Sequence, residues 1–173
     1  DLCPEDPFRE GMQPTSFPTF SAQELRGNSY LESIFDGIVP EIVNRTRSVI
    51  TPENTAMIGS SMGGLATLYS AIKHADRFHT ALALSPHWVL AGDPLVDWMI
   101  PRLPLTKEFK VWMSRGTKGL DALYEPLQDK ADQMMADAGW GARYRSKVFH
   151  RTTHNERSWA SYVDEPLRFW LSN

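Results

Sequence analysis

The chain has 173 residues, a length that fits one domain with a sizeable hydrophobic core. Its formal net charge of −3 gives no reason to expect nucleic acid or an anionic membrane as a partner, and no apolar run is long enough to span a membrane. The single cysteine, Cys3, excludes an intramolecular disulfide and a cysteine-based metal cluster, and it favours a reducing compartment such as the cytoplasm.

The first 28 residues carry four prolines and two glycines among aromatic residues, without a periodic pattern. We predict a long loop over residues 1–28, pinned by its aromatic side chains. Residues 29–47 predict a helix, because Ser29 is a suitable N-cap with Glu32 three positions later, and apolar side chains recur on one face. Pro40 interrupts this pattern and should kink or split the helix.

Residues 54–75 have the pattern of a strand, a tight corner and a helix. The corner reads G-S-S-M-G from Gly59 to Gly63, the setting of a G-x-S-x-G nucleophile elbow with Ser61 as the central serine. The hydroxyl of Ser61 would project from the sheet edge, and the N–H of Met62, in the first helical turn, could donate to an oxyanion. Small-residue corners also occur in ordinary strand–helix turns, so the motif alone does not decide the chemistry.

The remainder of the chain alternates apolar runs with helical patterns. The sequence predicts strands over 80–85, 109–113 and 143–149 and helices over 96–100, 121–138 and 158–171. The second of these helices should bury an apolar face made of Leu123, Leu127, Ala131, Met134 and Met135. Pro166 should distort the last helix. Strands that alternate with helices in this order predict an α/β fold built on a parallel sheet.

In parallel sheets of this kind, chemistry collects at the carboxyl ends of the strands. His154 lies in the loop after the last predicted strand, where its imidazole could swing over the sheet edge toward Ser61. A loop histidine is more often only solvated or a helix cap, but the position after a strand and downstream of the serine corner favours a catalytic role. His87 and Trp88 follow the strand over 80–85 and could line a substrate pocket; alternatively, His87 simply packs beside Trp88.

The carboxylate that orients His154 should follow the preceding strand, over 109–113. Asp121 is the nearest carboxylate to that strand end, but it would equally serve as the N-cap of the helix that begins there. Glu125, one helical turn further, ranks second. Either carboxylate would hold the tautomer of His154 and stabilise its imidazolium.

Several segments together resemble the putative-esterase family of α/β-hydrolases, which includes enterochelin esterases, esterase D-like enzymes, feruloyl-type carbohydrate esterases and mycolyltransferases. The segments are Ile58-Gly-Ser-Ser-Met-Gly-Gly-Leu65, Lys73-His-Ala-Asp-Arg-Phe78, Leu82-Ala-Leu-Ser-Pro86 with Trp88, and His154-Asn-Glu-Arg-Ser-Trp159. The resemblance runs from about Ser29 to the C-terminus. It implies a three-layer α/β-hydrolase fold, Ser61 as nucleophile and His154 as general base, and cleavage of carboxylic esters without a metal or organic cofactor.

Members of this family have several strands ahead of the elbow, whereas only about sixty residues precede Ser61 here. The chain, taken as a single domain over 1–173, therefore resembles the C-terminal portion of the fold, and no H-G-type loop upstream supplies a second oxyanion donor. An incomplete sheet would leave an open edge through which two copies could pair. The alternatives to ester hydrolysis are acyl transfer by the same residues and a catalytically silent remnant that binds a partner or itself.

Overall fold

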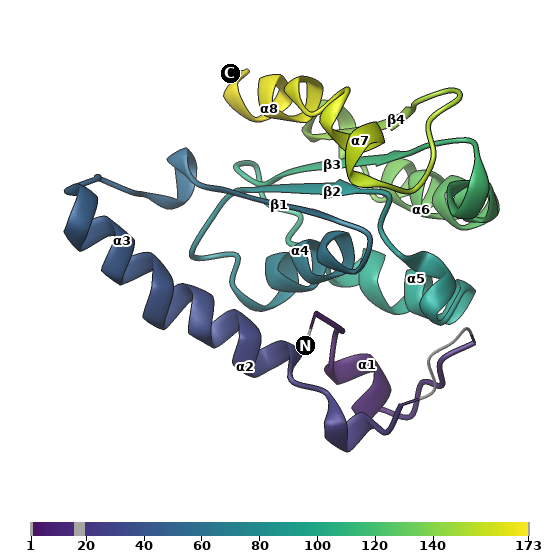
Figure 1. The fold of residues 1–173 in the computed structure, drawn as a ribbon, viewed down its shortest axis with the longest axis horizontal. Helices are drawn as coiled ribbons and strands as arrows, with labels where there is room; N and C mark the ends of the chain where they lie inside the picture. The colour runs from purple at the N-terminus through teal and green to yellow at the C-terminus, as the bar shows by residue number, and fades with distance from the viewer. Residues whose placement is uncertain (1, 16–19, 173) are drawn as a thin grey trace.

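The computed structural model describes residues 2–15 and 20–172, in which a four-stranded parallel sheet is covered by helices on both faces (Figure 1). The strands are β1 (Ala56–Ser60), β2 (Thr80–Leu84), β3 (Lys110–Arg115) and β4 (Tyr144–Val148). They lie in the order β1-β2-β3-β4, and each neighbouring pair is parallel. The predicted α/β class with a parallel sheet is confirmed.

Helices connect the strands, as parallel pairing requires. The α-helices are α1 (Asp6–Arg9), α2 (Gly27–Glu32), α3 (Val39–Thr46), α4 (Met62–Lys73), α5 (Asp93–Met99), α6 (Glu125–Asp137), α7 (Glu156–Ala160) and α8 (Asp164–Leu171). Figure 1 shows α4, α5 and α6 on one face of the sheet and α7 and α8 on the other. Among the described residues, no helix combines the length and the apolar composition needed to cross a membrane.

The side chains of β2 alternate between the two faces of the sheet. Ala81 and Ala83 belong to the larger core, which α4, α5 and α6 also line. Leu82 faces the opposite side, where it packs with Trp112 of β3 and Phe169 of α8. All five residues of β2 are buried, which explains why this strand is almost wholly apolar instead of alternating with polar residues.

The helix predicted over 29–47 is present, but it is longer and irregular. It begins at Gly27, so Ser29 does not cap it, and it passes through a π-helical stretch, Ser33–Ile38, before continuing as α3. The π stretch lies just before Pro40, whose ring would clash with the carbonyl four residues earlier in a regular α-helix. The helix therefore accommodates Pro40 by widening and does not split.

Two of the predicted helices differ from the observed ones. The helix predicted over 121–138 starts with 3₁₀ turns, Gly119–Tyr124, and Leu123 in these turns is 61% exposed, so its predicted burial was wrong. The helix predicted over 158–171 is divided into α7 and α8. Pro166 lies in the first turn of α8, where an N–H has no partner within the helix and its loss therefore costs little.

The predicted loop over 1–28 is only partly irregular. It contains the short helix α1 and a 3₁₀ turn, Ala22–Glu24, so the prediction of no regular element there was wrong. Phe8 is buried and its ring contacts Phe20 edge to face, with centroids 5.0 Å apart. Aromatic contacts therefore do hold this segment. Residues 1 and 16–19 of the predicted loop lie outside the described residues.

Candidate active site

Ser61 is the single residue at the corner between β1 and α4, where the sequence predicts a sharp turn. Its backbone has φ 57° and ψ −122°, a strained conformation for a residue with a side chain. The neighbouring strand and loop hold it there. The Ser61 N–H donates to the carbonyl of Leu84 at 2.9 Å, and the Ser61 carbonyl accepts from the N–H of His87 at 3.2 Å.

The corner requires a glycine at position 59, because β1 and α4 approach too closely for a side chain. A Cβ on Gly59 would lie 2.2 Å from the carbonyl oxygen of Gly63. We expect Gly59→Ala to lower the free energy of unfolding by about 1–3 kcal/mol or more, as overpacking does. Urea unfolding followed by circular dichroism measures this loss.

Gly63→Ala is the matched control for this prediction, because a Cβ placed there would meet no atom within 4 Å beyond its chain neighbours and the backbone of its own helix. Gly63 is part of α4, so alanine should leave the stability unchanged or raise it by up to about 1 kcal/mol. Equal unfolding midpoints for the two variants would contradict the steric argument.

Three side chains from distant parts of the chain meet at the corner. The Nε2 atom of His154 lies 2.7 Å from the Oγ atom of Ser61, and its Nδ1 atom lies 2.6 Å from Oδ1 of Asp121. A carboxylate can only accept a hydrogen bond, so Nδ1 carries the ring proton and Nε2 accepts the proton of the serine hydroxyl. The structure thus brings Ser61, His154 and Asp121 into one hydrogen-bonded chain.

Asp121 is 1% exposed, and donors surround its carboxylate. Its Oδ2 atom accepts from the main-chain N–H of Gly116 at 2.7 Å and from the hydroxyl of Ser85 at 2.9 Å. The indole N–H of Trp159 donates in turn to the Ser85 oxygen at 3.2 Å. These bonds fix the orientation of the carboxylate and offset the cost of burying a charge. Asp121 lies in the 3₁₀ turns before α6, and it does not cap this helix.

Two of the candidate residues lie away from this cluster. Glu125, the second-ranked acid, is directed to Arg115, with Oε1 at 2.7 Å from the guanidinium, and its side chain is 62% exposed. Trp88 is fully buried, and its indole N–H donates to Gln128 at 3.0 Å. Trp88 therefore packs inside the protein, and its proposed place in a substrate pocket was wrong.

His87 lies beside His154, with ring centroids 6.3 Å apart. A 2.6 Å hydrogen bond joins its Nδ1 atom to the hydroxyl of the buried Tyr124, whose ring meets His154 edge to face. Burial, and to a smaller extent the neighbouring His154, lower the pKa of His87 below its ordinary value. His87 is therefore neutral at neutral pH, and Tyr124 positions both rings.

Tyr124, Ser85 and Trp159 were not among the predicted site residues. One signal could have indicated Tyr124: it follows Asp121 by three positions, and residues three apart lie on the same side of a 3₁₀ turn. Ser85 follows the carboxyl end of β2, the edge where site residues gather. The contact of Trp159 with Ser85 depends on the packing of α7 and leaves no local pattern.

Met62 is the first residue of α4, directly after Ser61. The first N–H groups of a helix have no partner within it, so the Met62 N–H is available for a negatively charged oxygen beside the serine. Within the described part of the chain, no group of three or more His, Cys, Asp and Glu side chains is placed to hold a metal ion.

A family model described as Putative esterase matches residues 9–169, nearly the whole chain. The chain belongs to the Putative esterase family. The matched range contains Ser61, Asp121 and His154. A search among curated proteins gave no significant match.

Solved structures of several hydrolases share the fold of this Putative esterase member. An enterochelin esterase from Shigella flexneri is 16% identical, with a TM-score of 0.62 over 82% of this chain and 37% of that one. The enterobactin and salmochelin hydrolase IroE is 17% identical, with a TM-score of 0.65 over 89% and 59%. S-formylglutathione hydrolase FrmB from Staphylococcus aureus is 18% identical, with a TM-score of 0.58 over 84% and 66%. The matched part is thus 37% to 66% of these three chains.

Proposed function

We propose that this protein hydrolyses carboxylic esters through a covalent acyl-enzyme, with Ser61 as nucleophile, His154 as general base and Asp121 as the carboxylate that orients His154. The observation that carries the proposal is the hydrogen-bonded chain from Ser61 through His154 to Asp121, at distances of 2.7 Å and 2.6 Å. A strained strand-to-helix corner presents the serine, as nucleophile elbows do. Membership of an esterase family supports the same chemistry.

In the first step, the Ser61 oxygen forms a bond to the acyl carbon of the ester while its proton passes to Nε2 of His154. The carboxylate of Asp121 stabilises the imidazolium that results. The carbonyl oxygen of the substrate becomes an oxyanion, and the Met62 N–H donates to it.

In the second step, the bond between the acyl carbon and the alcohol oxygen breaks, and the leaving oxygen takes the proton from Nε2 of His154. The acyl group remains on Ser61. Water then attacks the acyl carbon while His154 again takes the proton, and collapse of this intermediate releases the acid and restores the Ser61 hydroxyl. Every proton that His154 accepts is thus returned within the cycle.

His87 is proposed to contact the bound substrate. Its ring is only partly buried beside His154, and the hydrogen bond to Tyr124 fixes its orientation. Because burial keeps His87 neutral, it can offer a hydrogen bond to the substrate without competing with His154 for the proton of Ser61.

A fluorophosphonate probe tests the proposal directly. The activated Ser61 oxygen should displace fluoride from phosphorus, which adds one probe per chain on the peptide that contains Ser61. Peptide mass spectrometry locates the adduct, and heat-unfolded protein is the control because the hydrogen-bonded chain is then lost. If folded protein remains unlabelled, the proposal is wrong and a catalytically silent member of the family is favoured.

A further inference from the structure

A cavity of about 420 Å³ lies beside Ser61, between the N-terminal segment and the residues that follow β2. Its wall includes Leu2, Leu25, Met62, His87 and Leu90. Met62 directly follows Ser61, and the N–H of His87 donates to the Ser61 carbonyl. Two of the lining residues therefore adjoin Ser61, one along the chain and one through a main-chain hydrogen bond.

Most of the residues that line the cavity are apolar. Cys3 is part of the wall, and burial raises the pKa of its thiol to about 12, so the thiol stays protonated and behaves as a small apolar group. Among the described residues of the wall, Glu24 supplies a carboxylate and His87 an imidazole. A negative charge at this place disfavours anionic ligands, and the apolar remainder favours hydrocarbon.

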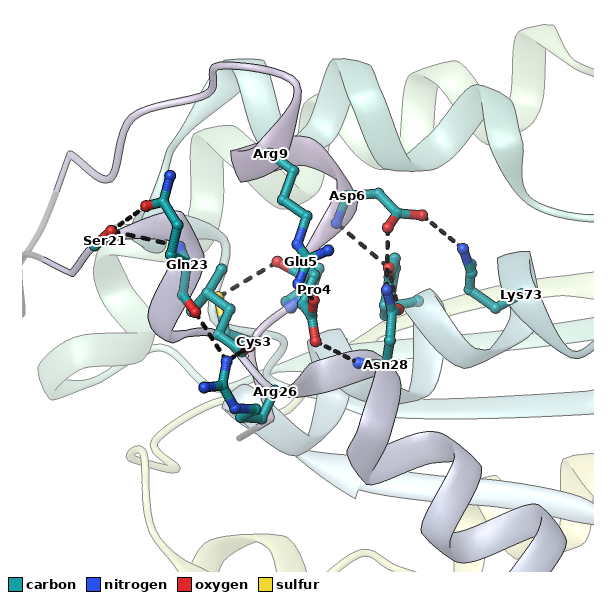
Figure 2. Close-up of polar contacts among 12 residues, drawn as sticks. Cys3, Pro4, Glu5, Asp6, Arg9, Ser21, Gln23, Arg26, Asn28 and Lys73 are labelled. Atoms are coloured by element: carbon teal, nitrogen blue, oxygen red, sulfur yellow. Dashed lines mark hydrogen bonds and ion pairs between the residues drawn. The ribbon is translucent and has the colours of Figure 1, made fainter.

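The wall on the N-terminal side is held firmly in place (Figure 2). The carboxylate of Glu5, which is 2% exposed, accepts from the main-chain N–H of Asn28 at 2.8 Å and pairs with Arg9 at 2.5 Å. Asp6 pairs with Lys73 of α4 at 2.8 Å. These contacts attach the segment that carries Leu2 to α2 and α4. They therefore fix the position of this wall of the cavity.

The position of the cavity distinguishes the two halves of an ester. The alcohol oxygen must take its proton from Nε2 of His154, so the alcohol half lies toward that ring. The cavity adjoins Met62, whose N–H would hold the oxyanion of the acyl carbon. One of its described lining residues, His87, lies beside the ring of His154, but none comes from the loop that carries His154. The acyl half is the one directed into the cavity.

We propose that this cavity binds the acyl chain of the substrate, and that it selects uncharged aliphatic chains of about four to eight carbons; this rests on the proposed function. A cavity of about 420 Å³ is at the small end of ligand-binding sites. At roughly 30 Å³ for each group the size of a water molecule, this volume corresponds to about fourteen such groups, so an octanoyl chain fits with space left for it to turn.

The test compares p-nitrophenyl esters from acetate to octanoate on the wild-type chain and on Leu2→Trp, which places an indole in the cavity. In the wild type, kcat/KM should rise about fourfold for each buried methylene until the cavity is full. Leu2→Trp should lower kcat/KM for the octanoate at least tenfold and leave the acetate within twofold. Val49→Trp is the matched control, because Val49 is 83% exposed and precedes β1, at the opposite end of that strand from Ser61.

Two results would overturn the assignment. One is an unchanged ratio of octanoate to acetate hydrolysis in Leu2→Trp. The other is a change that appears instead among acetate esters of different alcohols, which would make the cavity an alcohol site.

A binding measurement separates this proposal from the proposed function. Absence of both acetate hydrolysis and fluorophosphonate labelling would overturn the hydrolytic role. Binding of the acyl chain in the cavity can still be tested in that case, with methyl octanoate and the Ser61→Ala variant. We expect the ester to shift the methyl NMR signals of Met62, Leu25 and Leu90, and Leu2→Trp in the same background to weaken this binding at least tenfold. If these signals do not move, the acyl pocket is wrong whatever the catalytic result.

Discussion

Replacing Ser61 with alanine should lower kcat for p-nitrophenyl acetate by a factor on the order of 10⁶, to a rate set by the remaining binding and oxyanion contacts. The reason is that the variant lacks the atom that forms the acyl-enzyme, while His154 and Asp121 keep their mutual hydrogen bond. Steady-state hydrolysis, corrected for the spontaneous reaction, measures the loss. The fluorophosphonate adduct should disappear from the same protein.

Ser60→Ala is the matched control for this loss. Ser60 is the last residue of β1, adjacent to the corner, and it has no place in the hydrogen-bonded chain that ends at Asp121. We expect this variant to retain kcat within about threefold, since surface or half-buried changes away from the chemistry are usually small. Full activity in Ser61→Ala, with a normal circular dichroism spectrum, would show that another residue is the nucleophile.

Asp121→Asn should lower kcat by about 10⁴. The amide has nearly the shape of the carboxylate, so the buried position can still be filled, but its NH₂ group is a donor. That group can face the Nδ1 atom of His154, which moves the ring proton to Nε2 and leaves no acceptor for the proton of Ser61. Fluorophosphonate labelling should slow by a similar factor, which distinguishes loss of the base from loss of ester binding.

Glu125→Gln is the matched control for Asp121→Asn, because Glu125 is the other candidate for the carboxylate that orients His154. Its carboxylate pairs with Arg115, so its loss should change kcat by less than about threefold. The opposite ranking, with Glu125→Gln inactive and Asp121→Asn active, would reassign the acid and contradict the geometry of the site.

The succession of strands and helices, and the places of Ser61 and His154 within it, could be predicted because each depends on local signals. A wholly apolar run marks the buried strand β2, and a serine between glycines marks the corner after β1. Parallel strands bring their carboxyl ends to one edge, so a histidine after β4 is directed toward the serine without further information.

The choice between Asp121 and Glu125 could not be made from the sequence. Asp121 follows the last residue of β3 by six positions and Glu125 follows it by ten. Which of the two carboxylates faces the protein interior depends on the 3₁₀ geometry of Gly119–Tyr124. A helical repeat of 3.6 residues also placed Leu123 on the buried side, whereas the tighter turns direct it to solvent. A local change of helical period was therefore the source of both the ambiguity and the error.

The cavity beside Ser61 could not be predicted for a different reason. Its walls come from the N-terminal segment, from the start of α4 and from the residues after β2, which are far apart along the chain. Their approach depends on side-chain bonds such as that of Glu5 to Asn28, which no periodic pattern encodes. Sequence patterns locate elements, whereas cavities arise from how the elements pack.

The strand that ends at the nucleophile is also the outermost strand of the described sheet, and Ile58 at its middle is 44% exposed. A strand contributed by another chain would hydrogen-bond along the five residues of β1, which lead directly into the strained corner at Ser61. Self-association and turnover would then be thermodynamically linked. The specific activity would vary with protein concentration, even though no residue of the second chain enters the active site.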